Sequence, residues 1–201
     1  MTIFMATPDR AKLTPMLNFP NFLTLSRILA VPALVAVFYI DGRVAHWIVV
    51  ALFVTAALTD YLDGWIARTW SLESEFGRVV DPIADKLLVA AALLLLLAAD
   101  RAPLVAVGLI LLRELLVSGL REGLAGRLVL PVSRLAKWKT AAQMAAIMLL
   151  LIGPLGGTGG VLPLAGDCLL WVAAALTWIT ALDYLRTAWD PLTRGGEANR
   201  P

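Results

Sequence analysis

The sequence predicts an all-α integral membrane protein with six transmembrane helices and a short N-terminal amphipathic segment. Of its 201 residues, 60% are hydrophobic and only 16% are charged, and the mean hydropathy is +0.81. These values lie far from those of an ordinary soluble domain. Because a helix needs about 20 residues to cross a bilayer, six spans leave little room for a soluble domain.

Six apolar runs predict the six spans, and Gly and Pro residues punctuate the gaps between them. The spans are expected near residues 23–40, 44–64, 82–99, 103–122, 135–153 and 161–187. The chain then divides into a juxtamembrane segment at 1–20, a six-helix membrane domain at 21–190 and a polar C-terminal tail at 191–201.

The N-terminal segment, residues 1–20, carries apolar positions such as Phe4 and Leu13 that suit a short amphipathic helix on the membrane surface. Pro8 and Pro15 limit the length of that helix. The segment lacks the charged start, apolar run and cleavage site of a signal peptide, so we expect it to be retained.

Basic residues predict the orientation. If the six spans alternate in direction, most Lys and Arg residues fall on one side of the membrane, and the opposite loops hold only Arg43 and Arg101. Cytoplasmic loops are rich in Lys and Arg. We therefore expect a multi-pass protein of the cytoplasmic (inner) membrane, with both termini and the acidic segment on the cytoplasmic side. Membrane lipids surround such a protein, nothing indicates a nucleic-acid partner, and the sequence leaves open whether two copies form a homodimer.

Histidine and cysteine offer little for catalysis. Cys168 is the single cysteine, which excludes an intrachain disulfide and a Cys cluster for zinc or iron. His46 is the single histidine and stands beside Trp47 at a predicted loop, where an interfacial position is expected. The chemistry therefore falls to carboxylates, arginines and lysines.

Four aspartates stand at the end of the second predicted span and the start of the third, in the pattern D-x2-D-G-x2-A-R-x8-G-x3-D-x3-D. Asp60 and Asp63 share one helix face at i and i+3, and Asp81 and Asp85 share another at i and i+4. The two helices are consecutive and joined by a loop of about 16 residues, so we expect their ends to converge on one cavity. Pro82 fits the first turn of the third span, with Asp81 as its cap.

Acidic side chains are costly beside hydrocarbon and need metal ions, protons or water as partners. A cluster of Asp oxygens without His or Cys suits Mg²⁺ or Mn²⁺, and Ca²⁺ is a further option. The alternative interpretation is that these acids are solvated residues at helix ends.

The small residues within the pattern allow a close approach to the backbone. Gly64 and Ala67 fall on or near the acidic helix face, and Gly77 permits close packing at the start of the next helix. Arg68 follows directly and suits a bidentate grip on a pyrophosphate. The pattern therefore points to a phosphorylated substrate.

The complete pattern from Asp60 to Asp85 resembles the signature of the CDP-alcohol phosphotransferase family, and every specified position matches. Two further motifs resemble the phosphatidylglycerophosphate synthase branch of that family: Pro20 to Arg27 (PNFLTLSR) and Arg113 to Glu122 (RELLVSGLRE). The resemblance covers roughly residues 18–190 and implies the six-span layout.

The resemblance implies an enzyme in which a small alcohol, here sn-glycerol 3-phosphate, attacks the lipid-side phosphorus of CDP-diacylglycerol and CMP leaves. It implies two divalent ions, Mg²⁺ or Mn²⁺, and a role for Asp85 as the general base toward the attacking hydroxyl. The metal ligands that it implies are Asp60, Asp63, Asp81 and Asp85, and the CDP-binding residues are Gly64, Ala67, Arg68 and Gly77.

The acceptor carries its own phosphate, so its site should be cationic. The candidates are Arg113, Arg121, Arg134, Lys137 and Lys139. Arg113 is favoured because it and Glu114 interrupt an apolar helix, which is costly unless they face an aqueous cavity or pair with partners. The other four equally suit a topological role or attraction to anionic headgroups, worth about 1 kcal/mol per residue. Asn21, Thr24 and Arg27 of the first span are placed to reach the same cavity, although Asn21 and Thr24 equally suit capping of its helix.

Three alternatives are weighed against this interpretation. Another member of the same family would use inositol phosphate, serine or another alcohol as the acceptor, and the four aspartates do not separate these acceptors. An intramembrane prenyltransferase normally needs a second acidic motif on a distant helix, which is missing here. An ion transporter would use the carboxylates as its path, but it leaves Arg68 and the fixed glycines unexplained.

Overall fold

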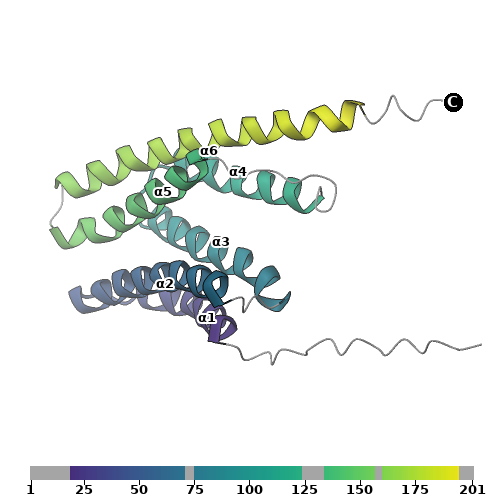
Figure 1. Ribbon diagram of the computed structural model, residues 1–201. Helices are drawn as coiled ribbons and strands as arrows, with labels where there is room; N and C mark the ends of the chain where they lie inside the picture. Colours follow the sequence, from purple (N-terminus) through teal and green to yellow (C-terminus); the bar gives the residue numbers. More distant parts are fainter. Residues whose placement is uncertain (1–18, 71–74, 124–133, 157–159, 195–201) are drawn as a thin grey trace, which may run out of the picture.

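The computed structural model describes residues 19–70, 75–123, 134–156 and 160–194, and its secondary structure in these ranges is entirely helical (Figure 1). The α-helices are α1 (Phe19–Phe38), α2 (Arg43–Trp70), α3 (Glu75–Ala98), α4 (Leu104–Gly123), α5 (Arg134–Ile152) and α6 (Val161–Arg194). A short 3-10 helix, η1 (Gly153–Gly156), follows α5. The all-α fold is therefore confirmed.

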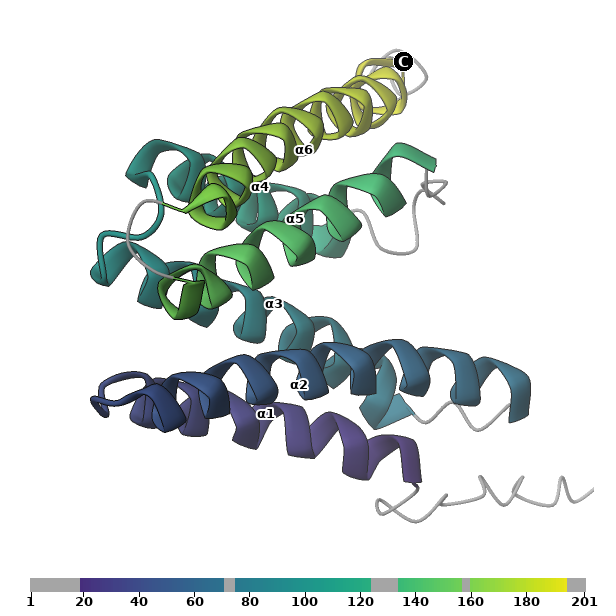
Figure 2. The ribbon, with the colours of Figure 1, turned by 90° about the vertical axis from the view of Figure 1, so that its left-hand side faces the viewer.

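The helices pack in two groups. α1 packs against both α2 and α3, while α4 and α5 each pack against α6. Smaller contacts of α5 with α2 and α3, and of α3 with α4, join the groups (Figures 1 and 2). Successive helices alternate in direction, so the start of α1, the α2–α3 junction and the ends of α4 and α6 lie at one end of the bundle, on the right in Figure 1.

Aliphatic side chains from every helix form the core. Its fully buried large members are Leu34, Val49, Phe53, Leu88, Leu93, Leu96, Val107, Ile110, Ile147, Leu151 and Leu170. Large apolar side chains also cover the outside, among them Leu29, Leu58, Leu112, Leu115 and Leu164. An apolar core beneath an apolar exterior is typical of a helical bundle surrounded by lipid.

Two segments of the described chain are long and apolar enough to cross a bilayer, Trp138–Leu155 and Val161–Leu182. Shorter apolar stretches lie in the other group of helices, at Thr24–Phe38, Arg43–Thr59 and Lys86–Ala98. These findings indicate a membrane protein, and they leave the number of spans as a prediction.

The predicted boundary around the aspartates is wrong. α2 continues to Trp70 and α3 begins at Glu75, so the two helices are separated by residues 71–74 and not by a loop of about 16 residues. Hydropathy shows only where the apolar residues stop. A helix continues past that point as long as its backbone hydrogen bonds form and no Gly or Pro ends it. The segment after Gly64 has neither residue before Trp70.

Pro82 and Asp81 consequently lie inside α3 and not at its first turn and cap. A proline inside a membrane helix is tolerated because neighbouring groups satisfy the freed carbonyl.

Two outer helix ends also differ from the predicted ones. α1 begins at Phe19, and α6 runs to Arg194, past the predicted end of the last span at residue 187. At 1.5 Å per residue, the 34 residues of α6 extend about 50 Å, which exceeds a hydrocarbon core of about 30 Å. The predicted amphipathic segment lies outside the described residues, apart from the start of α1.

Two connections between helices adopt left-handed backbone conformations. Gly42, between α1 and α2, has φ 125°, and Asp100, after α3, has φ 54°. At the end of α3, Arg101 N donates to Leu96 O (2.8 Å) and Asp100 N donates to Leu97 O (3.0 Å). This pair of hydrogen bonds is the Schellman cap, and it fixes the backbone of Arg101 relative to α3.

Gly166 sets the closest approach of α5 and α6. A Cβ placed on Gly166 would lie 2.8 Å from both Cγ and Cδ2 of Leu150 and 3.2 Å from the backbone nitrogen of Leu150. A change of rotamer moves Cγ and Cδ2 of Leu150 but leaves its backbone nitrogen in place. The absence of a side chain at Gly166 therefore lets the two helices touch.

Replacing Gly166 with Ala is expected to destabilise the folded protein by about 1–3 kcal/mol through overpacking against Leu150. Unfolding in detergent micelles, followed by circular dichroism against denaturant, measures the change. Gly108→Ala in α4 is the matched control, because a Cβ there meets no atom within 4 Å. Equal stability of Gly166→Ala and Gly108→Ala would contradict the prediction.

Candidate active site

The four aspartates lie in the helical segments that meet at the α2–α3 junction. Asp60 and Asp63 lie in the last part of α2, and Asp81 and Asp85 lie in the first part of α3. α2 and α3 pack against each other and are consecutive in the chain. The side chains of these residues lie outside the described part of the structure, so their convergence stays a prediction.

The candidate nucleotide-binding residues occupy the same two helices. Gly64, Ala67 and Arg68 follow Asp63 within α2, and Gly77 lies in the first turn of α3. Their side chains also fall outside the described residues. The backbone thus places the whole pattern at the end of the bundle where α1 begins and where α4 and α6 end (Figure 1).

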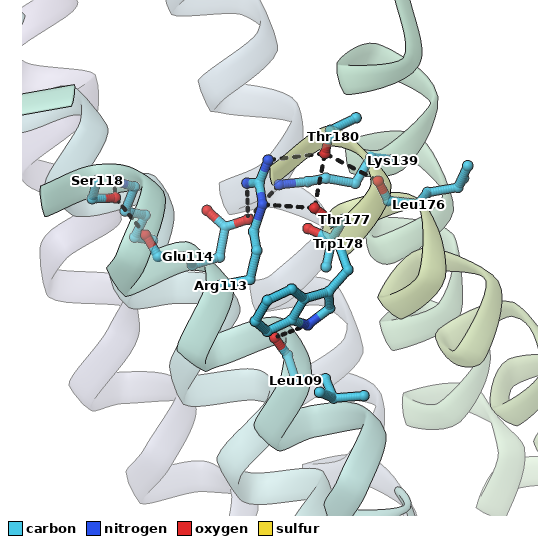
Figure 3. A network of polar contacts seen from close by, with 10 residues as sticks. Leu109, Arg113, Glu114, Ser118, Lys139, Leu176, Thr177, Trp178 and Thr180 are labelled. Atoms are coloured by element: carbon cyan, nitrogen blue, oxygen red, sulfur yellow. Dashed lines mark hydrogen bonds and ion pairs between the residues drawn. The ribbon is translucent and has the colours of Figure 1, made fainter. Parts of the chain in front are cut away.

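Arg113 connects α4 to α6 in the interior. Its residue surface is only 4% exposed. Its Nε donates to the backbone carbonyl of Thr177 (2.9 Å), and its Nη2 donates to Oγ1 of Thr180 (2.9 Å). Nη1 donates to Oε1 of Glu114 (3.0 Å). Each nitrogen of the guanidinium therefore has a protein acceptor, so pairing with partners explains this charge inside an apolar helix (Figure 3).

Glu114 balances two cations. The same oxygen, Oε1, accepts hydrogen bonds from Arg113 and from Nζ of Lys139 in α5. The Lys139 and Arg113 side chains are nearly inaccessible, and the Glu114 side chain retains some exposure. Since a buried charge is tolerated only when it is paired and hydrogen-bonded, this carboxylate holds α4 and α5 together.

A second polar contact joins α3 to α4. Nζ of Lys86 donates to Oγ of Ser118, which itself donates to the backbone carbonyl of Glu114 (2.6 Å). Lys86 directly follows Asp85 in the sequence. The network defined by Lys86, Arg113, Glu114, Ser118, Lys139, Thr177 and Thr180 thus spans α3, α4, α5 and α6.

Sequence reasoning missed four members of this network: Lys86, Ser118, Thr177 and Thr180. The only local signal for Lys86 was its position beside the aspartate pattern. Hydroxyl side chains are not distinctive in apolar helices, because they can bond to their own backbone, as Ser118 and Thr180 do. Thr180 does so through the carbonyls of Leu176 (3.0 Å) and Thr177 (2.9 Å).

The remaining acceptor-site candidates lie at the same end of the bundle. Arg121 is near the end of α4, while Arg134 and Lys137 begin α5. The side chains of these three residues lie outside the described residues. From α1, Thr24 and Arg27 are both 1% exposed, and both make polar interactions. They are therefore interior polar residues of α1.

Comparison with known proteins identifies the family. The model of the CDP-alcohol phosphatidyltransferase family matches residues 17–179. The chain belongs to this family. The match runs from just before α1 into α6 and includes every position of the aspartate pattern, which confirms the resemblance recognised in the sequence. Membership of the CDP-alcohol phosphatidyltransferases makes the chain an enzyme, and enzymes of this family generally depend on divalent metal ions.

Several curated relatives have similar sequences over most of their length. A protein of Rickettsia typhi named CDP-diacylglycerol–glycerol-3-phosphate 3-phosphatidyltransferase is 46% identical over 172 residues, covering 85% of this chain and 97% of the relative. Proteins of the same name from Cereibacter sphaeroides and Pseudomonas fluorescens are 38% and 39% identical, over 85% and 90% of this chain. They are covered to 95% and 94% of their own lengths.

Replacing Glu114 with Gln is expected to destabilise the protein by about 3 kcal/mol, because Arg113 and Lys139 would lose the carboxylate that neutralises them. Denaturant unfolding in micelles measures the change. Asp100→Asn is the control, since Asp100 is exposed and Asn tolerates its left-handed backbone conformation; its effect should stay within about 0.5 kcal/mol. Equal stability of Glu114→Gln and wild type would show that the pairing is dispensable.

Proposed function

We propose that the chain transfers the phosphatidyl group from CDP-diacylglycerol to sn-glycerol 3-phosphate, giving phosphatidylglycerophosphate and CMP. The observation that carries the proposal is the complete aspartate pattern across α2 and α3, in a chain whose curated relatives bear the name of this reaction over nearly their full length. The acceptor hydroxyl attacks the phosphorus on the lipid side of the diphosphate. The bond from that phosphorus to the bridging oxygen breaks, and CMP departs.

Asp60, Asp63, Asp81 and Asp85 are proposed to hold two divalent metal ions. The donor set consists only of carboxylates, which fits Mg²⁺ or Mn²⁺ better than softer metals. When bound, such ions supply charge neutralisation at the diphosphate and at the attacking and leaving oxygens. The protein contributes the two helices that carry the ligands.

Asp85 is also proposed as the general base that takes the proton from the attacking hydroxyl of glycerol 3-phosphate. Gly64, Ala67 and Arg68 are assigned to the CDP part of the lipid substrate, with Gly77 as a further nucleotide contact. The guanidinium of Arg68 suits bidentate binding of a phosphate group, and the small residues leave room beside the backbone.

The acceptor phosphate is proposed to bind among the cations at the ends of α4 and α5. Arg121, Arg134 and Lys137 begin or end these helices, close in the chain to the buried network. Arg113 and Lys139 belong to the same group of candidates, and both already contact Glu114. Because Arg113 and Lys139 are paired with Glu114, we assign them to positioning the acceptor site. Direct contact with the acceptor phosphate is assigned to Arg121, Arg134 and Lys137, which lie nearer the helix ends.

The proposed topology has six spans in the cytoplasmic membrane, with both termini and the aspartates on the cytoplasmic side. The membrane domain covers residues 21–190 between the juxtamembrane segment and the polar tail. The apolar exterior of the described helices and the paucity of basic residues in the opposite loops support this arrangement.

The choice of acceptor is tested by CMP release from CDP-diacylglycerol in detergent micelles containing Mg²⁺. Turnover is expected with glycerol 3-phosphate, and at most a background rate with serine or inositol phosphate, because only the matched acceptor places its hydroxyl for attack. A reaction with EDTA serves as the blank. Turnover with serine and none with glycerol 3-phosphate would replace the proposed acceptor.

The base is tested with Asp85→Asn, which removes the proton acceptor while keeping the size of the side chain. Transfer is expected to fall by at least about 100-fold, whereas binding of CDP-diacylglycerol is retained. Asp60→Asn is the comparison variant, and it should weaken metal-supported nucleotide binding as well as turnover. Near-normal turnover by Asp85→Asn would remove this residue from the role of base.

A further inference from the structure

A pocket of about 540 Å³ lies at the end of the bundle opposite the aspartates. Three connections form its walls: the turn between α1 and α2, the segment after α3, and the residues of η1. The segments that carry Arg43, Arg101 and Leu155 are far apart in the sequence, so the pocket exists only in the folded bundle. None of the residues assigned to the reaction lines this pocket.

The charges of this pocket are unbalanced. Arg43 and Arg101 both line it, with Asp41 as its carboxylate. Within the described ranges no ion pair joins either arginine to Asp41 or to another acid, and Nη1 of Arg101 is buried without a hydrogen-bond partner. Burial lowers the pKa of the Arg101 guanidinium. A cation that is partly desolvated at the edge of an apolar bundle is costly until an anion joins it.

The protein holds Arg101 more firmly than Arg43. The Schellman cap of α3 holds the backbone of Arg101, and its guanidinium lies 5.8 Å from the centre of the Phe38 ring. Arg43 makes only a long hydrogen bond, 3.4 Å from Nη2 to the carbonyl of Leu155. Nε2 of His46 lies 2.6 Å from the carbonyl oxygen of Leu151, so this nitrogen is already engaged by the protein. The pocket is therefore lined by two guanidinium groups, one anchored at Arg101 and one with little hold on the protein at Arg43.

Ile40 lines the pocket, and further exposed apolar and aromatic side chains adjoin the lining residues in the sequence. Tyr39, Ile40, Val44 and Trp47 stand among the pocket residues in sequence, and they are 69%, 59%, 75% and 52% exposed. Trp and Tyr side chains with this exposure are typical of the level of lipid headgroups in a membrane. A phospholipid bound at this depth places its acyl chains against exposed apolar side chains such as Ile40. A free inorganic anion has no acyl chains and makes no such contact.

We propose that this pocket binds the phosphate group of an anionic phospholipid from the leaflet opposite the active site, with Arg43 and Arg101 as its hydrogen-bond donors. Two guanidinium groups match the oxygens of one phosphate, and Asp41 accepts hydrogen bonds from hydroxyl groups of the headgroup. The site is separate from the reaction and does not depend on which alcohol is the acceptor.

The test is native mass spectrometry of the purified full chain in detergent, titrated with phosphatidylglycerol, with phosphatidylcholine and with inorganic phosphate. The wild type is expected to retain phosphatidylglycerol preferentially. Arg43→Gln and Arg101→Gln should each weaken that binding by about 10- to 100-fold, the value of a lost charge-assisted hydrogen bond. Arg186→Gln is the matched control, since Arg186 is an exposed arginine of α6, and it should bind as the wild type does.

Circular dichroism and gel filtration establish that each variant is folded. If Arg101→Gln fails to fold, Arg43→Gln decides, because Arg43 is exposed and its hydrogen bond to Leu155 is long. Undiminished lipid retention by a folded Arg43→Gln variant would overturn the proposal. Binding of inorganic phosphate as tight as that of phosphatidylglycerol would overturn the assignment to a lipid.

Discussion

The carboxylate of Glu114 has to neutralise two buried cations inside a bundle that is otherwise apolar. Arg113 and Lys139 come from different helices, and both reach one oxygen of this side chain. Because an unpaired charge in such surroundings is strongly unfavourable, the relative positions of α4 and α5 are set by electrostatics as well as by packing. The hydrogen bonds of Arg113 to Thr177 and Thr180 extend this constraint to α6.

This constraint bears directly on the proposed reaction, which handles two phosphorylated substrates. The network around Glu114 lies near the middle of α4 and reaches α3 through Lys86, which directly follows Asp85. A helix that carries metal ligands must not slide against its neighbours, because productive geometry is lost with displacements of about 1 Å. The network supplies polar anchors between α3 and the helices that bear the acceptor-site candidates.

Much of this arrangement could be predicted from the sequence. The parts that could not be predicted have one cause in common. Apolar runs located each helix, because whether a segment is apolar enough to face lipid can be read from the segment itself. They misplaced the end of α2, because that helix continues through polar residues to Trp70. The spacing of the aspartates predicted the family, which the comparison confirmed. Arg113 and Glu114 stood out as charges in an apolar helix, but their partners depend on packing between distant segments. Nothing local marks Thr177 or Thr180 as the acceptors of an arginine 64 and 67 residues away.

The helices α4, α5 and α6 are joined to one another more firmly than they are joined to α1, α2 and α3. α5 and α6 touch at Gly166 near one end of the bundle. Further along, the salt bridge between Glu114 and Lys139 joins α4 to α5, and Trp178 donates a hydrogen bond to the carbonyl of Leu109 between α6 and α4 (3.1 Å). Contacts between this half and α1–α3 are fewer. The interface between the two groups of helices is thus the most deformable part of the bundle. A lipid with two acyl chains that enters from the bilayer would separate the groups at this interface.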